Sequence, residues 1–132
     1  MSFKLSYRQE PKYLFVKISG QWTARSAEEA VEAVHDEAQK RGLTRLLIDT
    51  SEISQPDSEL TRFRTGEYWA KILGPPFKGS FVITPDLYNG FAETVALNRG
   101  AVVATFFEEP AAVDWLLQQS GETPPSAARH RR

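Results

Sequence analysis

Carboxylate and hydroxyl side chains are concentrated between residues 49 and 58, directly after an apolar run. Asp49, Glu52 and Asp57 could gather around a hard cation such as Mg²⁺, because Mg²⁺ prefers oxygen ligands. The same carboxylates can also solvate a loop and cap a helix, and no glycine that could cradle a phosphate lies between Gly42 and Gly66. We therefore favour the loop and capping roles, and we predict neither a metal nor a cofactor.

Side chains suited to covalent or acid–base catalysis are sparse. The chain has no cysteine, which excludes disulfides, thiolate nucleophiles and cysteine zinc sites, and which fits a reducing compartment. His35 could act as an acid or a base, but it lies in a segment rich in charge, and no candidate serine nucleophile is near it in sequence. We expect His35 to be a surface residue, and we predict that the protein is not an enzyme.

Residues 54–64 form the predicted contact surface. Asp57 or Ser58 can cap a helix that begins there, and two arginines follow within two turns. The free N–H groups at the start of that helix favour an anion, which the arginines could also contact, although the arginines could equally serve to hydrate the outer face. The residues that we predict to bind a partner are Ser54, Asp57, Ser58, Glu59, Arg62 and Arg64.

The apolar run that precedes this surface is expected to be the central strand of a sheet. Leu46, Leu47 and Ile48 are three consecutive large aliphatic residues, which suits a strand that is covered on both faces. Segments with strand patterns also occur near residues 3–7, 13–18, 79–84 and 101–107. The carboxyl ends of strands in open α/β sheets are where ligands and partners usually bind, so the polar cluster lies where function is expected.

Four helices are expected between and after these strands. Ser26-Ala27-Glu28-Glu29 has the spacing of a capping box, and Gly42 is suited to end the helix that follows it. A second helix should run from about residue 58 to 73, with Leu60, Phe63, Ala70 and Leu73 on its buried face and Gly66 at a close approach to another backbone. A third should end before Gly100, and Pro110 suits the first turn of a fourth.

This alternation predicts one mixed, mainly parallel α/β sheet of about five strands with about four helices. The first strand should be antiparallel to the second, because only a short turn at residues 10–12 joins them. We assign residues 1–120 to this single domain. Residues 121–132, which carry Arg129, Arg131 and Arg132, are expected to be a flexible basic tail that folding does not require.

Aromatic residues offer an alternative to the contact surface, namely an apolar ligand pocket. Aromatic side chains at these spacings more often belong to a core, so the two interpretations stay open. Phe107 and Tyr68 could also contribute to such a pocket. The residues that we single out as its candidates are Trp69, Phe77, Phe81, Tyr88, Phe91 and Phe106.

Charge and hydropathy exclude several classes of partner. The formal net charge of the 132 residues is −1, so the chain lacks the excess positive charge of a nucleic-acid-binding protein. No run is long and apolar enough to span a bilayer, and the amino terminus does not have the pattern of a signal peptide. We therefore expect a cytoplasmic protein without a membrane span. The sequence leaves the oligomeric state open, including a homodimer.

Three segments resemble a STAS domain, and especially its SpoIIAA-like branch. These segments are LFVKISGQW at 14–22, RLLIDTSEIS at 45–54 and VVATFFEEPAAVDWLLQ at 102–118, and the resemblance covers about residues 3–119. The family includes bacterial anti-sigma-factor antagonists, in which a D-S-S-G-like motif opens the second helix. A partner kinase phosphorylates the first serine of that motif.

The resemblance implies a non-enzymatic regulatory module that binds a protein, such as a kinase-like regulator. Asp57-Ser58 stands at the position of the family motif, so Ser58 is a candidate phosphorylation site, although Glu59-Leu60 replaces the following Ser-Gly. A phosphate there would meet the positive end of the helix dipole but would also be repelled by Asp57 and Glu59. Because some members of the SpoIIAA-like branch look suited to an apolar ligand, the alternative function is binding of a small apolar molecule or lipid.

Overall fold

Five strands form one sheet in the order β1-β2-β3-β4-β5, and four helices pack against it. The computed structural model describes residues 3–119. No helix in this part of the chain has both the length and the hydropathy needed to cross a membrane. In chain order the elements are β1 (Lys4–Gln9), β2 (Leu14–Gly20), α1 (Ala24–Arg41), β3 (Arg45–Ile53), α2 (Glu59–Leu73), β4 (Lys78–Val82), α3 (Phe91–Asn98), β5 (Val102–Phe106) and α4 (Glu109–Leu116).

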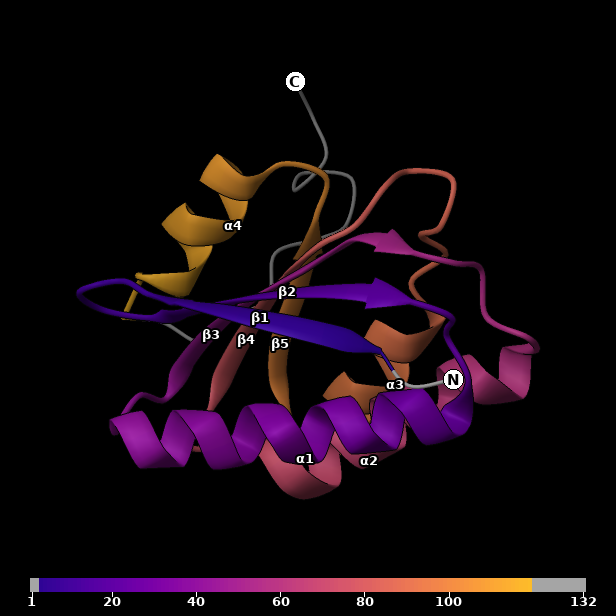
Figure 1. The fold of residues 1–132 in the computed structure, drawn as a ribbon, viewed down its shortest axis with the longest axis horizontal. Coiled ribbons are helices and arrows are strands. Elements are labelled where there is room, and N and C mark those ends of the chain that lie inside the picture. The colour runs from indigo at the N-terminus through magenta and orange to yellow at the C-terminus, as the bar shows by residue number, and fades with distance from the viewer. Residues whose placement is uncertain (1–2, 120–132) are drawn as a thin grey trace.

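The sheet is mixed in the predicted way, because β1 pairs antiparallel with β2 while all later pairs are parallel. Each parallel pair is joined through a helix, as parallel connections require. Helices α1, α2 and α3 cover one face of the sheet, and α4 covers part of the opposite face (Figure 1). The expected fold class of a single mixed α/β domain is therefore confirmed.

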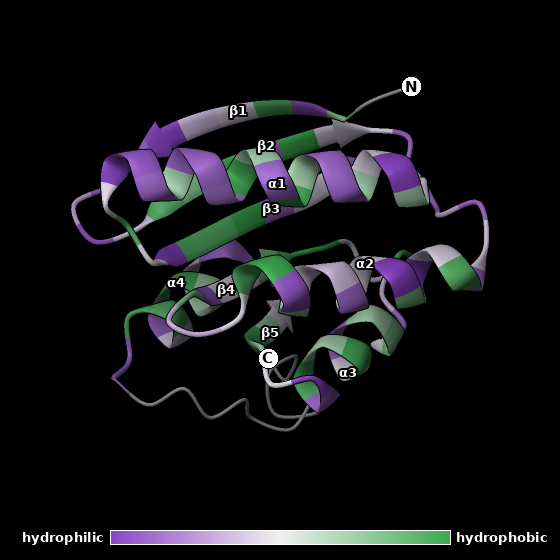
Figure 2. Cartoon of the chain, turned by 90° about the horizontal axis from the view of Figure 1, so that it is seen from below, coloured by the Kyte–Doolittle hydropathy of each residue, from purple (hydrophilic) through white to green (hydrophobic). Residues whose placement is uncertain are grey.

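The strand β3 is central and buried on both faces, as predicted. Leu46 and Leu47 have no exposed surface, and 1% of Ile48 is exposed. Leu46 and Ile48 belong to the cluster under α1 and α2, whereas Leu47 belongs to the cluster under α4. Figure 2 shows this hydrophobic strand behind α1 and α2.

The start of α1 differs from the expected capping box. Thr23 is the N-cap, its hydroxyl accepts a hydrogen bond from the Ser26 N–H at 3.0 Å, and the Thr23 N–H donates to the Ser26 hydroxyl at 2.9 Å. Ser26 is thus the third residue of the helix rather than its cap, and its buried hydroxyl also donates to the carbonyl of Gln21 at 2.8 Å. The end of α1 is as predicted, since Gly42 adopts the left-handed conformation with φ 70°.

The buried face of α2 also differs from the prediction. Its buried residues are Thr61, Arg62, Gly66, Trp69 and Leu73, whereas Leu60 is 57% exposed. Leu73 is therefore on the expected face but Leu60 is not. The helix packs against α3 at Gly66, where an added Cβ would overlap the Ala92 carbonyl oxygen, so the predicted close approach is confirmed and fixes the rotation of the helix.

Candidate functional site

The predicted contact surface lies at the carboxyl ends of β3 and β4. The segment 54–58 leads from β3 into α2, and the segment 84–90 leads from β4 to α3 (Figure 1). The Gln55 amide joins the two by donating to the carbonyl of Asp86 at 3.0 Å. Both segments therefore contribute to one edge of the sheet, although only the first was predicted to do so.

Ser58 is the N-cap of α2. Its backbone is extended, and its hydroxyl accepts a hydrogen bond from the Thr61 N–H at 3.3 Å. Asp57 directly precedes this N-cap, and its carboxylate accepts a hydrogen bond from the Thr61 hydroxyl. Ser58 is exposed, so its hydroxyl is accessible at the surface while it satisfies one free backbone donor.

Ser54 connects the loop to the end of β2. Its hydroxyl accepts a hydrogen bond from the Trp22 N–H at 3.2 Å, and its own N–H donates to the carbonyl of Gly20 at 2.9 Å. The loop that carries the predicted surface is therefore attached to the sheet and not only to α2.

The two arginines of the prediction lie in different environments. Arg64 is exposed on α2. Arg62 is only 5% exposed, and its guanidinium donates to Glu59 at 3.0 Å and to Gln55 at 3.3 Å. The guanidinium also lies 5.1 Å from the centre of the Trp22 ring. Arg62 therefore lies behind the predicted contact surface, within the protein, while the other five predicted residues are exposed on it.

The carboxylates of the magnesium alternative are engaged separately. Asp49 accepts a hydrogen bond from the Ser51 N–H at 2.9 Å, Glu52 forms an ion pair with Lys17 at 2.9 Å, and Asp57 is part of the helix cap. Among residues 3–119 there is no group of three histidine or acidic side chains that could hold a metal ion. His35 is half-buried beside Phe77, with 5.6 Å between ring centres.

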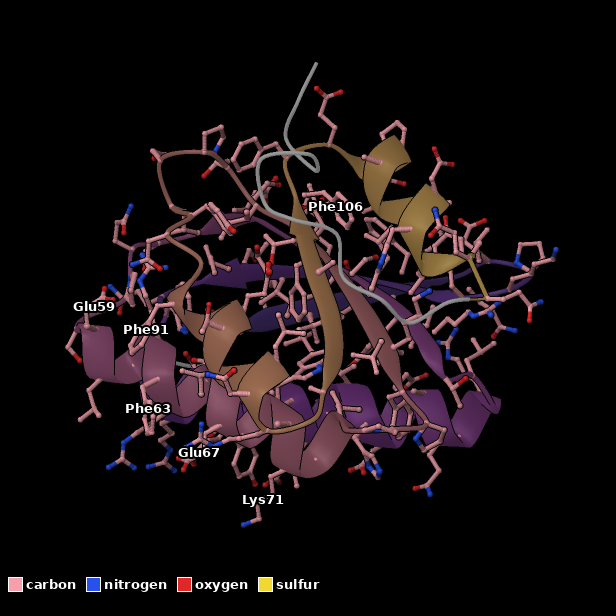
Figure 3. The ribbon with its side chains drawn as sticks, turned by 180° about the vertical axis from the view of Figure 1, so that it is seen from behind. Glu59, Phe63, Glu67, Lys71, Phe91 and Phe106 are labelled. Carbon is pink, nitrogen blue, oxygen red and sulfur yellow. The ribbon has the colours of Figure 1, made fainter. Side chains whose placement is uncertain are left out.

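An apolar patch lies on the predicted contact surface. Leu60, 57% exposed, and Phe91, 38% exposed, are the large hydrophobic side chains that the described residues expose. Half-buried Phe63 lies on α2 three residues after Leu60, and its ring centre is 6.5 Å from that of Phe91 (both are labelled in Figure 3). Glu59 borders this patch and accepts a hydrogen bond from the Asn89 amide at 3.2 Å. The sequence did not reveal the patch, because the pattern of α2 placed Leu60 and Phe63 inside.

A cavity of about 120 Å³ lies between the sheet and the helices α1, α2 and α3. Its wall is mainly apolar, and the exposed residue among those that line it is Asn89, in the segment before α3. Of the six predicted pocket residues, Trp69, Phe81 and Tyr88 line it.

The other three predicted pocket residues lie elsewhere. Phe106 belongs to the cluster on the α4 face of the sheet, Phe77 packs beside His35, and Phe91 is on the surface. Figure 3 shows Phe106 near α4, far from Phe91. These three were misplaced because a pattern of aromatic residues does not show which face of a sheet each one takes.

An irregularity in β3 shapes one wall of the cavity. The register between β2 and β3 shifts so that Lys17 pairs with Asp49 while Ser19 pairs with Glu52. The extra residue in β3 reverses the alternation of its side chains, and both Thr50 and Ile53 consequently line the cavity. A regular strand would have turned Ile53 to the opposite face.

Two polar groups of the cavity wall have capacity for further hydrogen bonds. The indole N–H of Trp69 is buried without a hydrogen-bond partner, which is uncommon for a buried donor. Arg62 uses its Nε and one Nη2 hydrogen for Glu59 and Gln55, so three of its five N–H hydrogens are not used in these bonds. By contrast, Thr50 donates to the carbonyl of Val82 at 2.8 Å, and the hydroxyl of Thr65 accepts from Trp22 at 2.9 Å.

Comparison with known proteins shows similarity at the level of structure. No protein-family model matches the chain, and no significant match occurs among curated proteins. Solved structures do match. An anti-sigma factor antagonist from Mycobacterium paratuberculosis has a TM-score of 0.62 and 16% sequence identity, over 89% of this chain and 96% of that one.

A second similar structure is an uncharacterised protein from Shewanella loihica that has a SpoIIAA-like fold. Its TM-score is 0.57 and its sequence identity is 19%, over 87% of this chain and 93% of that one. The present chain therefore has a SpoIIAA-like fold, which confirms the fold that the sequence resemblance implied.

Proposed function

We propose that this protein is a non-enzymatic regulatory module that binds a protein partner through the starts of α2 and α3. The observation that carries the proposal is the apolar patch of Leu60, Phe63 and Phe91. Within residues 3–119, the two exposed large hydrophobic side chains, Leu60 and Phe91, stand at the starts of α2 and α3, which the hydrogen bond from Asn89 to Glu59 joins beside the exposed cap residue Ser58. Exposed apolar side chains gathered at one place are typical of interaction sites.

The surroundings of the patch indicate the chemistry of the partner. Asp57 and Glu59 are exposed at its border, so a partner with an apolar anchor flanked by lysine or arginine would be complementary. The structural similarity to an anti-sigma factor antagonist supports a regulatory role of this kind. The patch also lies at the carboxyl ends of the central strands, where partners of α/β proteins commonly bind.

Replacing Leu60 with aspartate should weaken binding of this partner. The side chain is 57% exposed, so the variant should fold normally, while a carboxylate in place of this apolar side chain would have to be desolvated by the partner. Proteins captured from the source cell by the wild type should be identified and purified, and their affinity for each variant measured by titration. We expect the affinity to fall at least about tenfold, because an anchor residue contributes 1–2 kcal/mol or more.

The matched control is Ala33→Asp, which adds the same charge to an exposed position on α1. It should bind the partner like the wild type, and both variants should melt at nearly the same temperature as the wild type. A partner that binds the Leu60→Asp variant as tightly as the Ala33→Asp variant would refute this contact surface.

Ser58 is the proposed switch of the same surface. A phosphate on Ser58 would add about 1.5 to 2 negative charges between Asp57 and Glu59, which would increase the attraction of this surface for a partner flanked by lysine or arginine. Ser58→Asp should therefore strengthen the partner complex, whereas Ser58→Ala should keep the affinity and lose only the cap, about 1 kcal/mol of stability. Equal affinities of the two variants and the wild type would assign Ser58 a capping role alone.

The cavity supports a second candidate function, the binding of a small apolar molecule. Its wall is formed largely by apolar side chains from all three helices of this face and from β2 to β5. A cavity of about 150 Å³ with a similar lining is known to accept benzene, so a volume of about 120 Å³ is compatible with a small ligand. Binding of a neutral probe such as 1-hexanol tests this candidate.

A further inference from the structure

We propose that the ligand of the cavity is a small organic acid, whose carboxylate is bound by Arg62 and whose apolar body extends towards Trp69. This proposal rests on the second candidate function, the binding of a small molecule in the cavity. It adds the chemical class of the ligand and the residues that select that class.

Arg62 provides the positive charge. It is the one lysine or arginine among the residues that line the cavity, and its side chain is 6% exposed. Its carboxylate partner Glu59 is 63% exposed. Water therefore screens the negative charge of Glu59, which only partly compensates the buried positive charge of Arg62. A buried charge is costly unless it is well paired, and an arginine matches a carboxylate with two parallel N–H donors. An organic acid in the cavity would supply that second pairing.

Trp69 marks the opposite end of the proposed ligand site. Arg62, Gly66 and Trp69 lie on one face of α2, and two turns of helix correspond to about 10 Å between Arg62 and Trp69. The lining between these two positions is mainly apolar and includes Val34, Ile48 and Val103. A ligand with an anionic end and an apolar body would therefore find a donor at one end and hydrophobic contacts along its length.

The volume limits the size of this ligand. About 120 Å³ is close to the volume that holds a benzene molecule, which corresponds to a body of about six carbon atoms. Hexanoate is therefore a suitable probe, and 1-hexanol is its neutral counterpart of equal chain length. The carboxylate of Glu93 also lines the cavity and could favour a cation. Hexylammonium, a cation of the same chain length, tests for that preference.

The experiment measures the affinity of the full chain for hexanoate, 1-hexanol and hexylammonium by calorimetric titration at pH 7.5. We expect hexanoate to bind at least ten times more tightly than 1-hexanol and hexylammonium to bind most weakly. The amide and indole resonances of ¹⁵N-labelled protein locate the site. The indole N–H signal of Trp69 should shift with hexanoate, and that of Trp115, which belongs to α4 and packs against the other face of the sheet, should not.

Variants of Arg62 test its role directly. Arg62→Met retains the length of the side chain without its charge, and it should weaken hexanoate binding at least tenfold while leaving the affinity for 1-hexanol within twofold. Arg62→Lys keeps the charge and should recover part of the preference. If either variant fails to melt cooperatively, the ratio of hexanoate to 1-hexanol affinities in the wild type still decides the proposal.

The outcomes separate this inference from the function on which it rests. Equal affinities for hexanoate and 1-hexanol, both with a shift at Trp69, would overturn the acid preference and leave a cavity for neutral ligands. A preference for hexylammonium would also overturn it. Absence of binding by all three probes, with no shift at Trp69, would overturn both the inference and the ligand-binding function.

Discussion

Replacing Leu47 with aspartate is expected to leave the domain unfolded at room temperature. Leu47 has no exposed surface and pairs in the sheet with Phe15 and Ser80. Its side chain packs in the cluster that α4 covers with Trp115. The substitution would remove the apolar contacts, which are worth about 2–5 kcal/mol at such a site, and would also bury a carboxylate without a partner. The sum is comparable with the whole stability of an ordinary domain, about 5–15 kcal/mol.

Circular dichroism and thermal melting test this expectation, with Leu60→Asp as the matched control. The chemical change is the same, but Leu60 is 57% exposed, so its effect on the free energy of unfolding should stay within about 0.5 kcal/mol. A cooperative melt of the Leu47→Asp variant near the wild-type temperature would contradict the central, doubly covered position of β3.

Replacing Gly66 with alanine should destabilise the domain by several kcal/mol. In an open helix the same change would stabilise by up to about 1 kcal/mol, because alanine has the higher helix propensity. At Gly66, however, the new Cβ would overlap the carbonyl oxygen of Ala92 and lie 3.0 Å from the Cβ of Val95. The backbone of α3 cannot rotate away as a side chain could, so α2 and α3 would have to separate. Overpacking of this kind typically costs about 1–3 kcal/mol, and more where backbone must move.

Urea unfolding should be compared for Gly66→Ala and Gly42→Ala. Gly42 has no atom within 4 Å of an added Cβ, but its φ of 70° would strain alanine, at a cost of about 1 kcal/mol. We therefore expect the loss of stability to be clearly larger at Gly66 than at Gly42. A Gly66→Ala variant that is as stable as the wild type would show that α2 and α3 are not in this close contact.

The order of strands and helices could be predicted from the sequence because its signals are local. Three consecutive aliphatic residues indicated a strand buried on both faces, and Leu46, Leu47 and Ile48 are indeed central. Gly42 and Pro110 occupy the end and the start of helices as their backbone preferences require. The start of α1 was misplaced by three residues, because Thr23 and Ser26 form the capping box that had been assigned to Ser26 and Glu29.

The residues of the predicted contact surface lie at the expected edge of the sheet, but which of them are exposed was only partly foreseen. Leu60 was expected inside and Arg62 outside, and the structure has them the other way round. Residues two apart in a helix point to nearly opposite sides, so the rotation of α2 about its axis decides which of the two is buried. That rotation is set by the contact between Gly66 and α3, which periodicity within α2 alone does not specify.

By itself, then, the sequence determined the elements, their order and the edge at which polar residues gather, since propensities, caps and apolar runs act over a few neighbouring residues.

The tertiary structure decided which side chains are enclosed. It buried Arg62 beside the cavity, and it buried Lys78, whose pKa is lowered by desolvation and whose Nζ donates to the carbonyl of Trp115 at 2.8 Å. It also placed Trp69 and Phe81 in the cavity wall and Phe106 on the other face of the sheet. These outcomes depend on how helices and sheet pack against one another, and such contacts join residues that are far apart in the chain.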